Sequence, residues 1–265
     1  MVDYHLHTKR CCHADGTMEE YLAVAENKGL KEIGFADHFP LELIGYKPRS
    51  PVTMRADELD DYIDDVQKIK LMSANIEVKL GVEVDYLPGK ERKIEELLER
   101  YNLDYVIGSV HFLNGWDFTH PSYADHYKNM NLDSIYQQYF ALVKSAINSG
   151  LFDYIGHIDI VKKFGYQPEM NLTSIYEELA LLLKRSGVGL ELNTAGKDAP
   201  VGQFYPSPAL LKAALSEGVH ISLGSDAHSP QQVARYFPDA QAYLTGLGCL
   251  EISSYNRRIR KSVVF

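Results

Sequence analysis

Short apolar runs alternate with longer amphipathic segments along almost the whole chain, and this alternation constrains the fold more than any other feature. Seven runs have the length and composition of strands: Val2–Leu6, Glu32–Ala36, Val78–Val82, Tyr105–Val110, Asp153–Gly156, Gly189–Leu192 and His220–Leu223. Segments with helical spacing lie after them: Met18–Lys28, Ala56–Met72, Lys90–Arg100, Leu132–Ser149, Ile175–Ser186, Pro208–Glu217 and Gln231–Leu244. Strands that alternate with helices predict a parallel sheet of βα units.

Closed on themselves, these units would form a barrel one unit short of the eight-fold βα barrel. We therefore expect an α/β fold of the distorted (β/α)7 TIM-like type, as a single domain over residues 1–265. The alternative is an open, doubly wound sheet, but no GxGxxG or Walker-type loop follows any strand. The segment Phe112–Asn131 is turn-rich and too long for an ordinary connection, which predicts a lid over a site.

Charge and cysteine content exclude several classes of protein. The formal net charge of −9 disfavours a nucleic-acid binder, which needs a basic face to contact phosphates. Polar residues at the very start argue against a secretory signal, and no apolar run approaches the length of a membrane span. Cys11, Cys12 and Cys249 form neither a disulfide framework nor a CxxC motif. We expect a cytoplasmic protein without membrane contacts.

Histidines and carboxylates recur where the predicted strands end. His5 and His7 in YHLHT are two residues apart on a strand and so point to one side, and Asp226 and His228 in LGSDAH have the same spacing. Four other strand ends carry one such residue each: His38 in FADHF, Glu83 in GVEVDY, His111 in GSVHF and His157 in GHIDIVKKF. Because the C-terminal ends of barrel strands share one face, these side chains should be neighbours in space.

This set of side chains predicts a cluster of metal ions. Imidazole and carboxylate without thiolate suit zinc, manganese or iron better than calcium. The ligands are too many for one tetrahedral ion, and a carboxylate such as Glu83 can bridge two ions, as in sites that cleave phosphoesters. Burying so many polar groups without a cation would cost several kcal/mol. We therefore expect a metal site at the C-terminal face of the strands.

The chain resembles the PHP (polymerase and histidinol phosphatase) superfamily, and the histidinol-phosphate phosphatase branch in particular. The resemblance covers nearly the whole chain and rests on YHLHT, CCHADGTMEEY, FADHF, GVEVDY, GSVHF, GHIDIVKKFGY, ELNTAG, YPSP and LGSDAH, in that order. It implies three divalent ions. The implied ligand groups are His5, His7, Glu83 and Asp226 for one ion; Glu83, His111 and His157 for the second; and His13, His38 and His228 for the third. His13 is assigned through the resemblance alone.

The resemblance also implies a reaction, the hydrolysis of L-histidinol phosphate to L-histidinol and inorganic phosphate in histidine biosynthesis. A hydroxide bridging two ions would attack phosphorus in line with the departing alcohol oxygen. Glu83, Asp226 and His228 are the expected catalytic residues, with His228 or a metal-bound water as the proton donor.

The phosphomonoester substrate also requires groups that contact its phosphate and its ring. Basic residues that follow the metal motifs are candidates for the phosphate: Lys162, Lys163, Lys197 and Arg257. Phe118, in the predicted lid, is a candidate to cover the imidazole ring.

Polar residues next to the ligands are candidates to orient the histidines. They are Asp3, Asp85, Asp159 and Asn193, whereas Asp37 is expected to be structural.

Three other functions fit the same motifs. The first is a phosphoesterase for another small phosphomonoester, a nucleotide or a DNA end. The second is a nuclease or proofreading module, which the acidic charge and the absence of a basic segment disfavour. The third is a scaffold that has lost catalysis, which the retention of all the metal-ligand positions disfavours.

Overall fold

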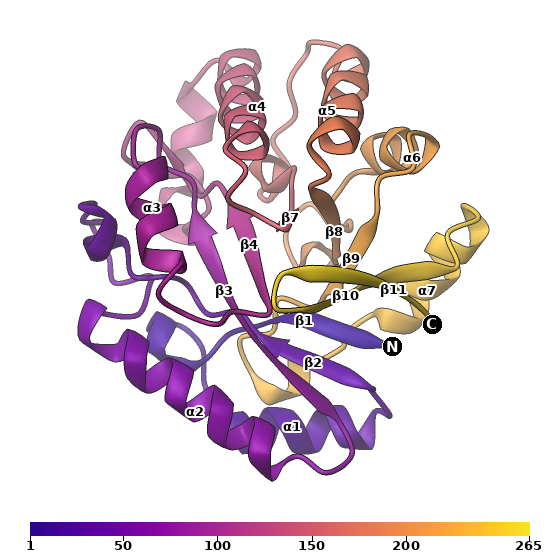
Figure 1. Cartoon of the computed structure of the whole chain (residues 1–265). Coiled ribbons are helices and arrows are strands. Elements are labelled where there is room, and N and C mark those ends of the chain that lie inside the picture. The colour runs from indigo at the N-terminus through magenta and orange to yellow at the C-terminus, as the bar shows by residue number, and fades with distance from the viewer.

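The computed structural model describes residues 1–265 and contains one seven-stranded sheet in the order β1-β2-β3-β4-β7-β8-β9 (Figure 1). The strands are β1 (Val2–Leu6), β2 (Glu32–Phe35), β3 (Glu77–Asp85), β4 (Tyr105–Ser109), β7 (Tyr154–Ile155), β8 (Gly189–Asn193) and β9 (Ile221–Gly224). Each pairing within the sheet is parallel. The edge strands also meet, because Ala227 forms a parallel bridge with Leu6. The predicted seven-stranded barrel is confirmed, and the open-sheet alternative is wrong.

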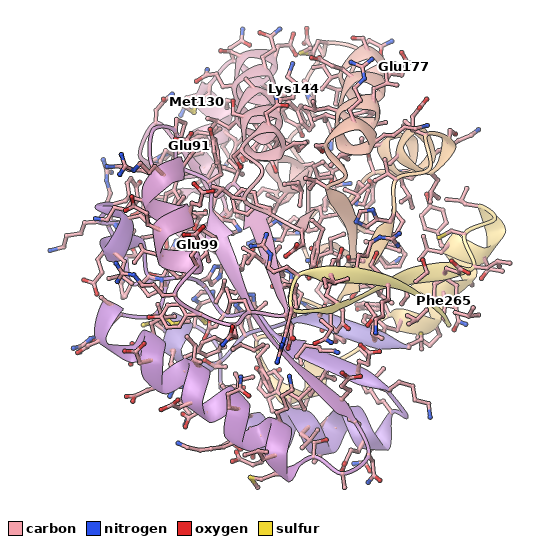
Figure 2. All side chains as sticks on the ribbon, in the orientation of Figure 1. Glu91, Glu99, Met130, Lys144, Glu177 and Phe265 are labelled. Carbon is pink, nitrogen blue, oxygen red and sulfur yellow. The ribbon has the colours of Figure 1, made fainter.

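Helices follow the strands and surround the barrel (Figure 1). They are α1 (Met18–Asn27), α2 (Leu59–Met72), α3 (Glu91–Leu98), α4 (Leu132–Asn148), α5 (Thr173–Ser186), α6 (Pro208–Ser216) and α7 (Phe237–Gly246). Each has an apolar and a polar face: on α5, for example, Leu179 and Leu183 are buried while Glu177 lies on the exposed face (Figure 2). No helix combines the length and the apolar character needed to cross a membrane.

The last helix begins six residues later than its predicted start at Gln231. Pro230–Gln232 forms a short 3-10 turn instead. Ala234 and Tyr236 then adopt φ angles of 51° and 58°, in the left-handed region that a right-handed helix cannot include. The apolar spacing of this segment therefore predicts the helix but not its first turn.

A C-terminal hairpin, which the sequence pattern does not predict, covers one end of the barrel. Its antiparallel strands β10 (Glu251–Asn256) and β11 (Ile259–Val264) lie across the near end in Figure 1. Tyr255 of β10 packs against three buried tyrosine rings of the barrel, Tyr4, Tyr105 and Tyr154. The ring centroids of contacting pairs in this group are 5.0 to 6.1 Å apart. These rings and the hairpin fill the barrel at this end, and the main cavity opens at the opposite end, beyond the C-terminal ends of the strands.

Candidate metal centre

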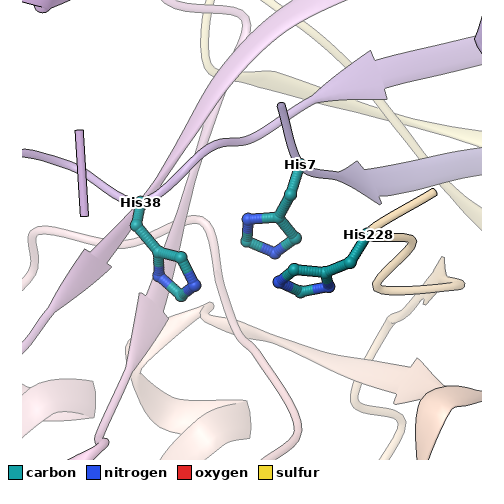
Figure 3. Close-up of side chains that lie close together, drawn as sticks. All are labelled: His7, His38 and His228. Atoms are coloured by element: carbon teal, nitrogen blue, oxygen red, sulfur yellow. The ribbon is translucent and has the colours of Figure 1, made fainter. Parts of the chain in front are cut away.

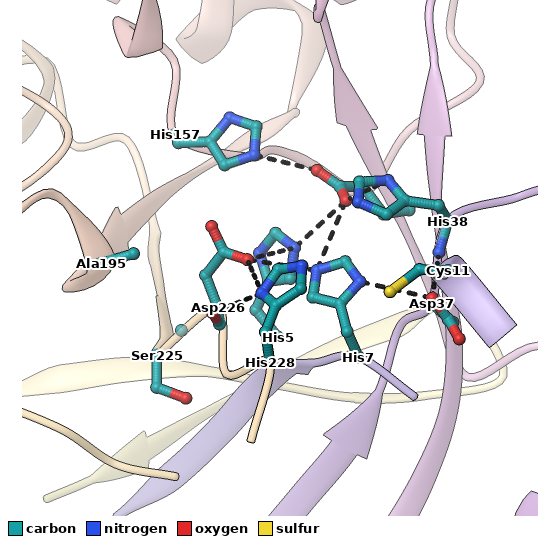
Figure 4. A network of polar contacts seen from close by, with 12 residues as sticks. His5, His7, Cys11, Asp37, His38, His157, Ala195, Ser225, Asp226 and His228 are labelled. Carbon is teal, nitrogen blue, oxygen red and sulfur yellow. Dashed lines mark hydrogen bonds and ion pairs between the residues drawn. The ribbon is translucent and has the colours of Figure 1, made fainter. Parts of the chain in front are cut away.

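All the predicted metal ligands gather at the open end of the barrel, although they come from distant parts of the sequence. Figure 4 labels six of them: His5, His7, His38, His157, Asp226 and His228. Most lie on a strand of the sheet or within four residues of its end. They are His5, His7, His38, Glu83, His111, His157, Asp226 and His228. His13 follows the short 3-10 turn Lys9–Cys11. The barrel therefore explains how residues spread over more than 200 positions form one site.

The first group of implied metal ligands, His5, His7, Glu83 and Asp226, surrounds one point between β1, β3 and β9. His5 Nε2 lies 3.4 Å from Glu83 Oε2 and 3.9 Å from Asp226 Oδ1. His7 Nε2 lies 3.6 Å from the same oxygen of Glu83 and 3.2 Å from Asp226 Oδ1. Two imidazole nitrogens and two carboxylate oxygens thus face one another at distances that a shared cation can span.

In the second group of implied ligands, His111 and His157 meet at the other oxygen of Glu83. His157 Nε2 lies 2.9 Å from Glu83 Oε1, and His111 Nε2 lies 3.7 Å from it. The two imidazole nitrogens are 3.4 Å apart. Since the two oxygens of Glu83 face different sets of histidines, this side chain has the orientation of a bridging ligand.

The third group is more exposed. His13 Nε2 and His228 Nε2 lie 2.9 Å apart at the cavity wall. His38 stands across from His228, with His7 between them (Figure 3), and its Nδ1 lies 2.9 Å from Glu83 Oε2. The structure thus pairs His13 with His228 and directs His38 toward Glu83. Ring nitrogens of His7, His38 and His228 also lie within 4.8 Å of one another, which is close enough to share an ion.

Unpaired buried atoms show that divalent ions fit this site. His5 Nε2 and His7 Nε2 are fully buried and form no hydrogen bond, and the buried Glu83 Oε2 has imidazole nitrogens close by but none aligned to donate to it. An unpaired buried polar atom costs about 1–3 kcal/mol, so three that converge on one point indicate a missing partner. Nitrogen and carboxylate oxygen are ligands that zinc, manganese and iron accept. The residues present therefore fit the metal ions that the sequence predicts.

Two ligands are held in left-handed backbone conformations. The φ angle is 24° at His157 and 51° at Asp226, which is unfavourable for residues other than glycine. The strand before Asp226 also requires a glycine, because a Cβ at Gly224 would lie 2.1 Å from Glu191 Oε1 and 2.7 Å from His5 Cβ. The backbone around the site is thus fixed by packing.

Buried carboxylates orient three of the histidines. Asp85 Oδ1 lies 2.9 Å from His111 Nδ1, which agrees with the orienting role predicted for Asp85. Asp37 Oδ1 lies 3.4 Å from His7 Nδ1, so Asp37 also contacts a ligand instead of being only structural. Each contact favours the tautomer with its proton on Nδ1 and leaves Nε2 free for a metal ion.

Glu191 is the third such carboxylate, and the sequence pattern does not single it out. Its Oε1 lies 2.6 Å from His5 Nδ1, and its Oε2 accepts the backbone N–H of His157 at 2.8 Å. It is fully buried on β8. Its position in ELNTAG, two residues before Asn193, was the available signal, because alternate residues of a strand face the same side.

The other predicted orienting residues have different partners. Asn193 Nδ2 donates to Glu191 at 3.0 Å and to Asp226 Oδ2 at 3.3 Å, so it links the two carboxylates. Asp3 accepts the backbone N–H groups of Ser225 and Ala234, and so holds the loop that carries Asp226. Asp159 is not placed against a ligand: it accepts the backbone N–H of Ser207 and pairs with Lys162.

The site concentrates negative charge. Although burial opposes their ionisation, the pKa values of Glu83 and Asp226 lie well below the ordinary range because several imidazoles surround them. Burial likewise opposes charge on the histidines, yet the carboxylates raise the pKa of His7 and of His111 to about 9. In the metal-free protein, protons on these imidazoles therefore balance the charge of the carboxylates. Bound cations would take over this role and release the protons.

A cavity of about 660 Å³ opens directly onto the ligands. The predicted catalytic residues Glu83, Asp226 and His228 all line it. So does Lys163, whose Nζ donates to the Thr119 carbonyl at 2.9 Å. Burial lowers the pKa of Lys163, against the effect of nearby Asp226 and Asp117.

Arg235 also lines this cavity, and the sequence pattern does not predict it. Its guanidinium donates to the carbonyls of Ser225 and Asp226 at 3.0 Å each and pairs with Asp198 at 2.8 Å. The sequence predicts a helix over this segment, but left-handed residues on either side of Arg235 interrupt it and direct the side chain to the cavity.

Four residues predicted to bind substrate do not line the cavity. Lys162 is buried, where it donates to the Phe204 carbonyl at 2.9 Å, and Lys197 lies over the Phe204 ring. Arg257 is at the opposite end of the barrel, in the turn of the hairpin, where its backbone N–H bonds Asp104. Phe118 is fully buried against Trp116 and Tyr139. These positions correct the expectation of direct substrate contact for Arg257 and Phe118, because neither side chain reaches the cavity.

The predicted lid segment does border the cavity. It forms a small hairpin of β5 (Phe112–Leu113) and β6 (Trp116–Asp117), followed by the 3-10 turns of Pro121–Asn129. Buried Phe118 and Tyr127 anchor it to the barrel, while Asp117, Thr119 and His120 face the cavity. Its position over the site agrees with the prediction.

Comparisons with known proteins agree with this geometry. The profile of the PHP domain family matches residues 3–195. A protein from Deinococcus radiodurans named a probable histidinol-phosphatase is 38% identical over 265 residues, which cover 98% of each chain. A Schizosaccharomyces pombe protein of the same name is 24% identical over 93% of this chain and 87% of its own. The fold is also similar, with a TM-score of 0.82 and 20% identity over 98% of both chains, to a Lactococcus lactis histidinol phosphate phosphatase whose crystal structure holds zinc, L-histidinol and phosphate.

Proposed function

The chain belongs to the PHP domain family, and from this premise we propose that it hydrolyses L-histidinol phosphate to L-histidinol and inorganic phosphate. The observation that carries the proposal is the convergence of the predicted ligands on a cavity that also holds two basic side chains, Lys163 and Arg235. The near-full-length similarity to the Deinococcus radiodurans protein supports the choice of substrate.

We propose three divalent ions for the site, zinc, manganese or iron, held by the ligand groups described above. Bound ions would neutralise phosphoryl oxygens and lower the pKa of water, which is the chemistry that phosphomonoester hydrolysis requires. The unpaired atoms of His5, His7 and Glu83 support this occupancy, as does the zinc in the Lactococcus lactis structure.

The remaining side chains of the cavity would position the phosphate. Lys163 supplies a point charge, while Arg235 is fixed beside Asp226 by its bonds to two carbonyls and can offer its free N–H groups as a fork. Glu83, Asp226 and His228 stay our proposed catalytic residues, because all three line the cavity. We propose further that residues 1–265 act as one cytoplasmic domain in histidine biosynthesis, which the three free cysteines suit.

The test is an assay of phosphate release. The purified protein, loaded with Zn²⁺ or Mn²⁺, should release phosphate from L-histidinol phosphate with a kcat/KM at least roughly 100-fold above that for phenyl phosphate, because only the first ester uses all of the cavity. Short DNA should release nothing. Equal, slow hydrolysis of every phosphomonoester would reject this substrate in favour of another small ester, and activity on DNA ends alone would favour the nucleic-acid alternative.

A further inference from the structure

Between the metal ligands and the surface, the cavity contains one carboxylate that has no cationic partner. We propose that Asp117 binds the ammonium group of the substrate's alcohol part, and that a small aromatic cavity beside it receives the ring. The inference deepens the proposed function and rests on it, since it names the groups that recognise the alcohol.

Asp117 differs from the other carboxylates of the main cavity in its partners. Glu83 and Asp226 face the imidazoles of several ligands, and Asp85 bonds His111. Asp117 forms no ion pair or hydrogen bond with a lysine, arginine or histidine side chain and bonds only within its own loop, although Lys163 and His111 lie near enough to sense its charge. No group of the cavity therefore neutralises this carboxylate by direct contact.

The carboxylate of Asp117 is held in one orientation. Its Oδ1 accepts the Thr119 hydroxyl at 2.9 Å and the backbone N–H groups of Thr119 and His120 at 3.1 Å each. Oδ2 makes no hydrogen bond, and the residue is half-buried at the cavity wall. A fixed acceptor with a free oxygen can bind an ammonium at little cost in side-chain entropy.

A second cavity of about 200 Å³ begins where Asp117 stands. It shares Ser50, Phe112 and Asp117 with the main cavity. Its other walls include Trp116, Tyr123 and His126. Flat aromatic walls of this kind suit a small planar ring.

This layout matches the order of groups in L-histidinol phosphate. The ammonium is on the carbon next to the ester-bearing carbon, and the imidazole is one carbon further from the phosphate. With the phosphate at the metal ligands, the ammonium would reach Asp117 and the ring would enter the second cavity. Exposed Arg49 on the wall of that cavity favours the neutral form of the imidazole.

The ammonium is tested with 2-aminoethyl phosphate and ethyl phosphate, which differ only in the amine at that carbon. The wild-type protein should prefer the amine by roughly 10- to 100-fold in kcat/KM, through KM, as expected for a charge-assisted hydrogen bond. Asp117→Asn should abolish this preference, change ethyl phosphate by less than about twofold and keep the metal content. Asp125→Asn, which alters an exposed carboxylate of the same segment that pairs with Lys128, is the matched control and should change nothing.

The ring is tested with Tyr123→Ala. This variant should raise KM for L-histidinol phosphate by roughly tenfold and leave 2-aminoethyl phosphate unchanged, since only the first substrate has a ring to stack. Two results would overturn the inference. One is a preference for 2-aminoethyl phosphate that survives in Asp117→Asn, and the other is an equal loss of kcat/KM on 2-aminoethyl phosphate and ethyl phosphate. If the wild type does not cleave L-histidinol phosphate, the proposed function fails, while the two ethyl esters still decide the role of Asp117.

Discussion

At the scale of the residue, Glu191 shows how a metal ligand is prepared before an ion arrives. Its carboxylate fixes the tautomer of His5 through Nδ1 and also holds the strained backbone of His157. These two histidines belong to different ligand groups. A single buried side chain thus aligns two parts of the centre.

Replacing this carboxylate should weaken metal binding without unfolding the protein. In Glu191→Gln the amide N–H₂ would donate to His5 Nδ1, which moves the imidazole proton to Nε2, where the ion must bind. We expect a loss of roughly 10- to 100-fold in zinc affinity, measured by chelator competition. Glu178→Gln, on the exposed face of α5, is the control and should bind zinc like the wild type. Unchanged affinity in Glu191→Gln would refute the role.

The histidine pKa values predict how metal affinity varies with pH. In the metal-free protein His7 and His111 have pKa values of about 9, so both carry protons at neutral pH. An ion must displace these protons, so affinity should rise at least roughly tenfold from pH 6.5 to pH 9. Calorimetry in two buffers of different ionisation enthalpy would detect the protons released. An affinity that does not change with pH would contradict the prediction.

At the scale of the element, the segment from Phe112 to Asn131 combines an anchor with a binding face. Phe118 is predicted to cover the substrate because it is an aromatic residue of the expected lid, but the ring is buried against the barrel. Its neighbours Asp117 and Thr119 face the cavity instead. The alternation of an irregular loop cannot be read from sequence, because no sheet or helix period fixes which residues point inward.

Truncation of Phe118 should therefore affect stability more than substrate binding. Phe118→Ala leaves a void among Trp116, Tyr127 and Tyr139 and should cost about 3–5 kcal/mol of unfolding free energy, measured by urea denaturation. Met130→Ala, at an exposed position in the same segment, should cost less than about 0.5 kcal/mol. A raised KM with unchanged stability in Phe118→Ala would instead support direct contact with substrate.

At the scale of the whole molecule, the candidate metal centre combines side chains from strands around the barrel. The ligands come from β1, β3 and the segments after β2, β4, β7 and β9. Because these elements meet only when the barrel closes, ions bound there stabilise the folded state and not the unfolded chain.

Removal of the ions should therefore lower the melting temperature. At free metal near 1,000 times Kd, binding contributes about 4 kcal/mol, or roughly 10 °C in Tm for a chain of this size. The chelated protein should lose stability as pH rises from 6.5 toward 9, because the raised pKa values of His7 and His111 stabilise the metal-free fold only while these groups are protonated. Restoring zinc is the control. Equal melting temperatures with and without chelator would contradict this stabilising role.

Sequence alone predicted the barrel and the strand-end histidines and carboxylates that gather at one end of it, whereas His13 was assigned through the family resemblance. The alternation of apolar runs and helical segments predicts the strands, and histidines at strand ends fall on one face because parallel βα units share a direction. These are local properties, because a period of two residues in a strand or of 3.6 residues in a helix is visible in the order of neighbouring side chains.

The tertiary structure alone decided which other polar groups contact the site. Glu191 reaches His5 only because Gly224 lets the strands approach closely, and Arg235 reaches the cavity through two left-handed residues. The hairpin that closes the far end also places Arg257 away from the substrate. Contacts between residues far apart in sequence depend on the packing of the whole chain, and no local pattern records that packing.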